Sequence, residues 1–188
     1  GIAELVEEFI AAGRPSSRQQ SITQRREGYI ASAVLAGETE TRVDIQTIEL
    51  EGMTLRIVSP LNAPTLLPTI IYYYGGCFVS GGFATHDNQL RQLAYYGQCR
   101  IIAVQYRLAP EHTFPAAHDD AQRGAELVRQ HAERLGVDKQ RITLAGDSAG
   151  GHLALVTALR LKRAGEWQPA QLILIYPMLD ATAHFGSY

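Results

Sequence analysis

The chain has 188 residues, of which 46% are hydrophobic and 19% charged, a composition typical of a globular domain that can bury a sizeable core. Its 17 Lys and Arg residues against 19 Asp and Glu residues give a formal net charge of −2. No basic cluster is longer than Arg25-Arg26. These features exclude the electrostatic signature of a protein that binds nucleic acid or an anionic lipid surface, so a small or neutral substrate is expected.

Nothing in the sequence predicts a membrane span, a leader or a metal centre. Apolar runs such as residues 172–176 are far shorter than the roughly 20 residues that a spanning helix needs. Residues 1–12 lack the basic start and the apolar block of a signal peptide. Cys77 and Cys99 are too few for a disulfide framework, and no ligand spacing indicates zinc. We therefore expect a cytoplasmic protein without a metal site.

The first 37 residues are predicted to be helical. Apolar residues recur at the spacing of an amphipathic helix at Ile2, Leu5, Val6, Phe9 and Ile10. Gly13 and Pro15 end this helix, and a weaker stripe predicts a second helix over residues 17–35. Because both helices precede every strand signal, we expect residues 1–37 to form a separate segment that lies across a core of residues 38–188.

A β-hairpin is predicted next. Between residues 42 and 59 the period of the apolar residues changes to two, with Glu51-Gly52 at the turn. The phase of the alternation shifts between Ile45 and Ile48. A shift of this kind indicates a β-bulge, which we place near Gln46.

Beyond residue 69, apolar runs without alternation are separated by helical patterns. The runs are rich in Ile and Val, as in strands that are buried on both faces. They occupy residues 70–74, 101–106, 142–145 and 172–176, with helices expected over residues 88–97, 116–135 and 148–163. This alternation predicts an α/β fold, with a mostly parallel sheet and helices on both of its faces.

The segment Gly146-Asp147-Ser148-Ala149-Gly150 matches G-x-S-x-G between a predicted strand and a predicted helix. A strand that turns abruptly into a helix leaves no room for side chains beside the serine, which explains the flanking glycines. The hydroxyl of Ser148 would then project at the carboxyl end of the sheet, where a helix N-terminus favours a developing anion. We predict that Ser148 is a nucleophile. The alternative is a helix N-cap whose neighbouring glycines only allow close packing.

A nucleophilic serine needs main-chain donors for an oxyanion, and Ala149 is one candidate because it follows the serine directly. The loop Gly75-Gly76-Cys77 follows the first buried strand and is predicted to supply the others, with Gly76 and Cys77 as the foremost candidates. A phosphate-binding loop is a competing interpretation, but neither G-x-G-x-x-G nor G-x-x-x-x-G-K-[ST] is present. A purely structural turn is the other alternative.

Three segments carry a wider similarity: residues 72–83, 106–117 and 146–151. In order and spacing they resemble the hormone-sensitive-lipase-like branch of the α/β-hydrolases, the bacterial family IV esterases. The resemblance implies an α/β-hydrolase core, N-terminal helices that form part of a cap over the site, and hydrolysis of short-chain carboxylic esters through an acyl-enzyme at Ser148, without a cofactor. Arg107 is expected to pair with Asp119 or Asp120 in a structural role.

Two positions depart from that family. Its oxyanion loop begins with a histidine and three glycines, whereas Tyr74 stands in place of the histidine and Cys77 in place of the last glycine. A Cβ at position 77 is costly if φ there is positive, so a loss of efficiency is expected. A thiol in this loop has no base beside it in the sequence, which argues against Cys77 as a nucleophile.

The acid and the base of a triad should follow the serine in the order Asp or Glu, then His. Asp180 and His184 do follow, but they are too close in sequence to place an imidazole between the carboxylate and Ser148. His152 lies one turn into the same helix and is expected to pack away from the site. The resemblance implies an acid and a base beyond residue 188, together with the last strands of the sheet.

These observations lead to a divided expectation. The parent protein should hydrolyse esters, whereas residues 1–188 alone should be nearly inert, because loss of the base costs roughly 10⁶ in rate in a well-studied serine protease. An unpaired edge at residues 172–176 would favour a homodimer or association with the missing C-terminal segment. The alternatives are a catalytically inactive homologue that binds a small ligand, and a peptidase, for which no suitable acidic cluster is found.

Overall fold

The computed structural model describes residues 1–13, 19–180 and 182. The helices are α1 (Ile2–Ala11), α2 (Ile22–Ala31), the 3₁₀ helix η1 (Ser32–Ala36), α3 (Phe83–Gly97), α4 (Ala116–Gln130) and α5 (Ala149–Arg163). The strands are β1 (Val43–Leu50), β2 (Met53–Pro60), β3 (Leu67–Tyr73), β4 (Arg100–Val104), β5 (Val137–Asp147) and β6 (Gln171–Ile175).

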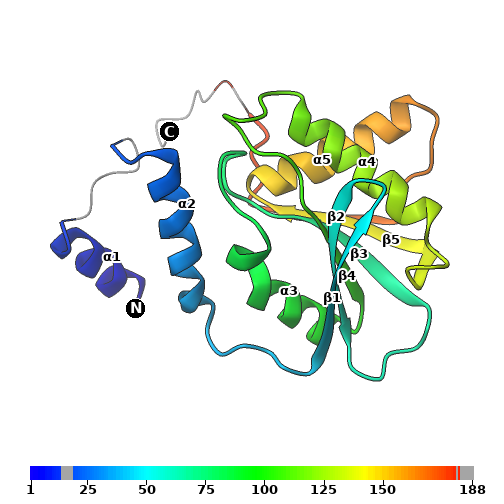
Figure 1. Ribbon diagram of the computed structural model, residues 1–188, viewed down its shortest axis with the longest axis horizontal. Helices are drawn as coiled ribbons and strands as arrows, with labels where there is room; N and C mark the ends of the chain where they lie inside the picture. The colour runs from blue at the N-terminus through cyan, green and yellow to red at the C-terminus, as the bar shows by residue number, and fades with distance from the viewer. Residues whose placement is uncertain (14–18, 181, 183–188) are drawn as a thin grey trace.

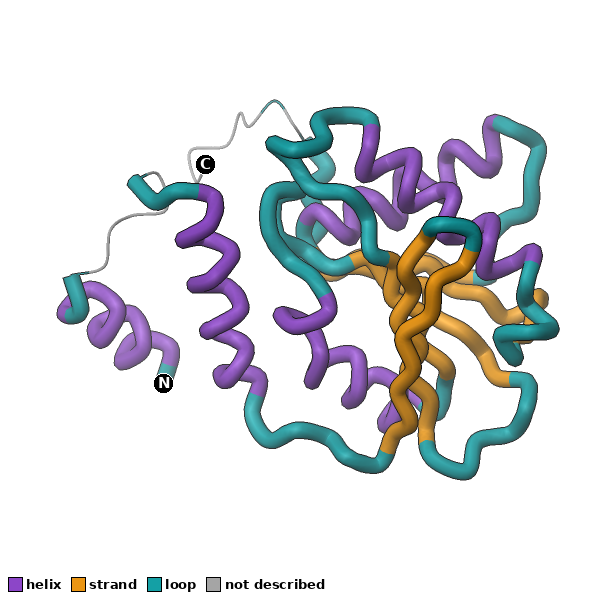
Figure 2. Tube along the Cα trace, in the orientation of Figure 1, coloured by secondary structure: helices purple, strands orange, loops and turns teal. Residues whose placement is uncertain are grey.

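The strands form one six-stranded sheet in the order β1-β2-β4-β3-β5-β6. The hairpin β1–β2 joins β4 in antiparallel orientation, whereas β3, β4, β5 and β6 run parallel to one another. Helix α3 covers one face of the sheet, and α4 and α5 cover the other (Figure 1; Figure 2). The predicted α/β fold with a mostly parallel sheet is therefore confirmed.

Burial on both faces explains the apolar runs. Ile71, Tyr72 and Tyr73 of β3 are fully buried although they alternate between the two faces, and so are Ile101 and Ile102 of β4. A strand between two helical layers has no solvent face, so its sequence needs no alternation of polar and apolar residues. This arrangement also brings the carboxyl ends of the parallel strands to one edge of the sheet.

The predicted bulge near Gln46 is wrong. The register of the hairpin is continuous from Val43 opposite Pro60 to Leu50 opposite Met53. Both faces of the hairpin are partly covered, because Arg56 of β2 reaches Asp87 of α3 at 3.2 Å while its neighbour Leu55 is buried on the opposite face. The shift in the apolar pattern reflects this double covering, not an inserted residue.

The observed helix bounds differ from those that the apolar stripes predict, and hydrogen bonds at the helix starts explain two of the differences. Helix α2 begins at Ile22, because Ser21 and Gln24 form a capping box, with Ser21 Oγ 3.2 Å from the Gln24 amide; the predicted start at residue 17 lies outside the described residues. Helix α3 begins at Phe83, five residues before the predicted start, where Thr85 Oγ1 accepts a hydrogen bond from the Gly82 amide at 3.0 Å. Helix α4 ends at Gln130, before the predicted residue 135.

The N-terminal helices lie beside the core, with α1 on the far side of α2 from the sheet (Figure 1). Val6 and Ile10 of α1 are exposed, and so are Ile30 of α2 and Val34 of η1. No helix of the described residues is long and apolar enough to span a membrane. The proposed division at residue 37 remains a prediction.

Candidate active site

Ser148 occupies a sharp bend between β5 and α5. Its φ of 53° and ψ of −116° are unusual for a residue with a side chain, and such strain is concentrated at functional sites. The Ser148 amide donates to the Ile175 carbonyl at 2.9 Å, which anchors the bend to β6. The side chain is half-buried and makes no capping hydrogen bond to α5. Ser148 is therefore the N-cap residue of α5 by position, but its side chain does not cap the helix, which leaves the hydroxyl without that structural role.

The glycines on either side of the bend are required by space. A Cβ on Gly146 would overlap the main chain of Gly150, and a Cβ on Gly150 would overlap the Tyr73 carbonyl. Because these obstacles are main-chain atoms, they cannot be relieved by a side-chain rotation. The predicted reason for the two glycines in the G-x-S-x-G pattern is confirmed.

The loop after β3 is held against this bend. Tyr73 pairs with Gly146 across the β3–β5 ladder, so the loop leaves the sheet next to the serine. The Gly75 amide donates to Asp147 Oδ1 at 3.0 Å. Gly76 has a φ of 135°, and its carbonyl accepts from the Ser80 amide at 2.9 Å in a tight turn.

The three loop residues differ in what their amides can still do. The Gly75 amide, predicted as a possible oxyanion donor, is already bound to Asp147 and is not free. Among the described residues, no hydrogen-bond partner is found for the amides of Gly76, Cys77 or Ala149. Donors that are unpaired at the carboxyl edge of a sheet and at a helix N-terminus can bind an oxygen anion.

Cys77 has the positive φ at which a side chain was expected to be costly. Its φ is 54°, in the left-handed region, and the following Phe78 has a φ of 62°. Holding a residue with a Cβ in this region costs about 1 kcal/mol. The Cys77 thiol is exposed, whereas that of Cys99 is buried and both are free.

A buried polar network beneath the bend is not predicted from the sequence. Asp147 is only 4% exposed and His86 of α3 only 3%. The Asp147 carboxylate accepts from the Tyr72 hydroxyl at 2.8 Å and contacts His86 Nε2 at 3.1 Å. Burial alone would raise the pKa of Asp147, but hydrogen bonds from His86, Tyr72 and Gly75 hold it below its ordinary value. The only sequence feature that pointed to this network is the acidic residue directly before the serine.

No hydrogen bond joins a described histidine to the Ser148 side chain. His152 Nδ1 lies 2.9 Å from the Met178 carbonyl, and its Nε2 lies 3.1 Å from His118 Nε2. A carbonyl only accepts, so His152 donates from Nδ1 to Met178. The His152 ring packs edge-on against Phe78, the residue after Cys77, with ring centroids 5.7 Å apart, so it lies beside the loop while its nitrogens are engaged elsewhere. Asp180 accepts from the Thr182 amide at 2.8 Å, and His184 lies outside the described residues.

Arg107 pairs with Asp120 and not with Asp119. Its Nε and Nη2 both lie 2.8 Å from the Asp120 carboxylate, whose Oδ2 also accepts from the Arg107 amide at 2.9 Å. Asp119 instead binds Arg160 of α5 at 2.7 Å. These pairs join the segment after β4 to α4, and α4 to α5, which agrees with the predicted structural role of Arg107.

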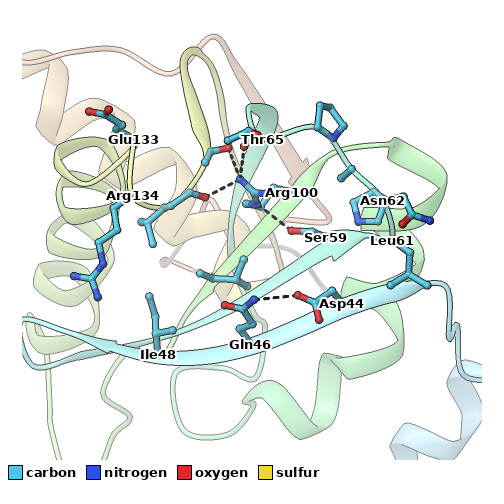
Figure 3. A pocket seen from close by; sticks show the side chains of 16 residues that line it. Asp44, Gln46, Ile48, Ser59, Leu61, Asn62, Thr65, Arg100, Glu133 and Arg134 are labelled. Atoms are coloured by element: carbon cyan, nitrogen blue, oxygen red, sulfur yellow. Dashed lines mark hydrogen bonds between the residues drawn. The ribbon is translucent and has the colours of Figure 1, made fainter.

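A cavity of about 560 Å³ lies at the other end of the parallel strands. It is bordered by the starts of β4 and β5, where Arg100 donates to Ser59 Oγ at 3.0 Å and to the Leu135 carbonyl at 2.7 Å (Figure 3). Ligands of parallel α/β sheets bind at the carboxyl ends of the strands, which is the end that carries Ser148. This cavity is therefore separate from the candidate site.

The fold and the serine bend define the class of protein. Residues 70–188 match the family described as alpha/beta hydrolase fold, and the chain belongs to this family. It is 36% identical over 152 residues to the carboxylesterase NlhH of Mycobacterium tuberculosis, covering 79% of this chain and 48% of that protein. It is 35% identical over 189 residues to an ethyl acetate hydrolase of Pseudomonas putida, covering 95% of this chain and 59% of that protein.

Solved structures show the same similarity. An ester hydrolase from the metagenome of Lake Arreo superimposes with a TM-score of 0.88 at 35% identity, covering 99% of this chain and 61% of the other. An esterase of the archaeon Pyrobaculum calidifontis gives a TM-score of 0.83 at 38% identity, covering 95% and 58%. The chain therefore spans about half to three fifths of the length of these relatives.

Proposed function

We propose that the protein carrying this chain is a serine hydrolase that cleaves short-chain carboxylic esters. One observation carries the proposal: Ser148 sits on a strained bend with no capping bond, beside a loop in which the amides of Gly76 and Cys77 are unpaired among the described residues. The named relatives, a carboxylesterase and an ethyl acetate hydrolase, are consistent with this chemistry.

In this proposal Ser148 Oγ attacks the acyl carbon of the ester, its proton passes to a general base that later returns it to the leaving alcohol, and the carbonyl oxygen becomes an oxyanion. The amides of Gly76, Cys77 and Ala149 donate to that oxygen, and the N-terminus of α5 adds a favourable dipole. Collapse of the intermediate breaks the bond to the alcohol and leaves an acyl-enzyme. Water then releases the acid and restores the serine. The role of Gly75 is to hold the loop through Asp147.

The general base and its carboxylate partner are proposed to come from outside the described residues. His86, His118 and His152 are engaged with Asp147, with each other or with Met178, and none of their recorded bonds involves the Ser148 hydroxyl. The relatives are longer than this chain, since it covers only 48% of one and 59% of another. A separate Asp180–His184 pair remains the less favoured source.

Helices α1 and α2 are proposed to form part of a cap over the site. Tyr29 of α2 packs edge-on against His86, with ring centroids 5.9 Å apart. Burial, with a smaller effect of the Asp147 charge, raises the pKa of Tyr29 to about 12, so its phenol stays neutral. A neutral aromatic wall suits a small, uncharged ester. The cytoplasm remains the proposed location.

The test is active-site labelling and turnover in the full-length protein. A fluorophosphonate should modify Ser148, and S148A should lower hydrolysis of p-nitrophenyl acetate by roughly 10⁶ or to background. The matched control is S59A, which removes a hydroxyl bonded to Arg100 at the opposite end of the sheet and should keep turnover within about twofold. Label on another residue, or full turnover in S148A, would overturn the proposal.

A second candidate is an inactive homologue that binds a small ligand without turnover. The positive φ of Cys77 favours it, because a strained loop aligns donors less well. Full-length protein that binds a trifluoromethyl ketone but neither hydrolyses esters nor reacts with the phosphonate would establish this alternative.

A further inference from the structure

The buried network around Asp147 joins the two halves of the candidate oxyanion site. Asp147 directly precedes Ser148 in the sequence, and Gly75 directly precedes Gly76. Asp147 Oδ1 accepts a hydrogen bond from the Gly75 amide. One carboxylate therefore links the nucleophile to the loop that carries the proposed donors. A shift of this carboxylate would change the distance between Ser148 and the loop.

Two further donors keep this carboxylate in place. The Tyr72 hydroxyl lies 2.8 Å from Oδ1, and His86 Nε2 lies 3.1 Å from Oδ1 and 3.3 Å from Oδ2. An ionised carboxylate only accepts hydrogen bonds, so His86 must carry a proton on Nε2. Hydrogen bonds to a charged group in a buried site are among the strongest in proteins.

The donors are themselves fixed by the start of α3. His86 Nδ1 lies 2.8 Å from Thr85 Oγ1, and the Tyr72 hydroxyl accepts from Gln89 Nε2 at 2.7 Å. The network thus connects α3, β3, the serine bend and the loop. The bonds to the Asp147 carboxylate are buried, whereas those from Thr85 and Gln89 are part-buried at the edge of the core.

We propose that His86 and Tyr72 are positioning residues of the ester hydrolysis, which hold the Asp147 carboxylate so that the Gly76 and Cys77 amides face the oxyanion formed at Ser148. The inference rests on the proposed function. Neither residue touches the substrate, so both act through Asp147. Their removal should weaken binding of the transition state while leaving binding of the ester nearly unchanged.

The first test compares H86L with H86Q. Leucine fills the space but donates nothing, whereas the Gln amide can place a donor near the former Nε2. We expect H86L to lower kcat for p-nitrophenyl acetate about 10- to 100-fold with KM changed by less than about threefold. Ki for a trifluoromethyl ketone should rise by the same factor as kcat/KM falls. H86Q should restore most of the loss.

The matched control is H131L, because His131 pairs with Glu51 at 2.9 Å away from the serine bend. It should change neither kcat nor Ki beyond about twofold. Should H86L fail to fold, Y72F provides the test, since it removes only the hydroxyl. We expect kcat to fall about 3- to 10-fold in Y72F. Y95F, which removes a hydroxyl bonded to Arg42, is its control.

Unchanged kcat and Ki in folded H86L and Y72F would overturn the positioning role while leaving the proposed function standing. An effect confined to thermal stability, or a loss of kcat not restored by H86Q, would also overturn it. A wild-type protein with no Ser148-dependent turnover would overturn both proposals, so the two failures are distinguishable.

Discussion

The serine bend and the N-terminal helices are attached to the same core by different means. At the bend, the main chains of Tyr73, Gly146 and Gly150 approach so closely that no Cβ fits between them. Of the ten residues described in α2, by contrast, none is buried. Its polar contact with the core is made by Arg26, which binds Glu111 through two bonds of 2.7 Å and the Val79 carbonyl at 2.8 Å.

The difference separates a fixed site from a detachable cover. Close main-chain packing can be lost only when the core itself opens, because the obstacles cannot move independently. A helix with no buried residue, held by the half-exposed Arg26 and by Tyr29 against His86, can leave by local unfolding at a small fraction of the global free energy. We therefore expect the bend to be as stable as the whole core and α2 to open separately. Each of the following predictions tests one side of this comparison.

The largest effect on stability is expected from G150A. Its new Cβ would overlap the Tyr73 carbonyl, so the free energy of unfolding should fall by about 3 kcal/mol or more. The control is G28A in α2, where nothing lies within 4 Å and the backbone is helical. Because α2 opens separately, that change should leave the free energy of global unfolding within about 0.5 kcal/mol of wild type. Urea unfolding of both variants measures the effect, and similar values would contradict the comparison.

The reaction rates of the two thiols test which part of the fixed region is open to solvent. Cys77 is exposed on the loop, whereas burial raises the pKa of Cys99 to about 11. Because a thiol reagent attacks the thiolate, we expect Cys99 to react roughly 100-fold more slowly than Cys77 at pH 8. Reaction with a chromogenic disulfide measures both phases. C77S should remove the fast phase alone, and two equally fast thiols would show that the core beneath the loop is open.

Removing the attachment of α2 should have an intermediate effect. R26A deletes the bonds to Glu111 and Val79, so chymotryptic cleavage after Tyr29 should become about 5- to 30-fold faster at nearly constant global stability. R160A is the matched control, because it deletes an exposed pair with Asp119 between α4 and α5. Equal cleavage rates in wild type and R26A would show that α2 is held by other contacts.

The smallest effect concerns acid. The hydrogen bond from Arg26 lowers the pKa of Glu111 from 4.5 in a free side chain to about 2. The stabilisation by this pair is complete above pH 4.5 and is lost as the pH falls toward 2. The melting temperature of wild type minus that of E111Q should therefore be constant near neutrality and shrink below pH 4.5. A difference that does not depend on pH would exclude an ionised pair.

Local patterns predicted the architecture because each depends on near neighbours in the chain. Unalternated runs at residues 70–74 and 142–145 indicated strands buried on both faces, and G-x-S-x-G indicated the bend at Ser148. The failures arose where a pattern has two causes. The shifted phase of the apolar residues near Gln46 reflects helices on both faces of the hairpin. The start of α2 was predicted too early because the apolar stripe does not show the cap at Ser21.

By itself, the sequence determined the class of fold, the order of its elements and the identity of the bent serine, since these follow from periodicity and from the space that glycine leaves. Only the tertiary structure decided which donors remain free. His86 and Asp147 are 61 positions apart, and the partner of the Gly75 amide is 72 positions away. Such contacts exist only after β3, β5 and α3 have packed, because strand register and helix placement bring their atoms within hydrogen-bond distance.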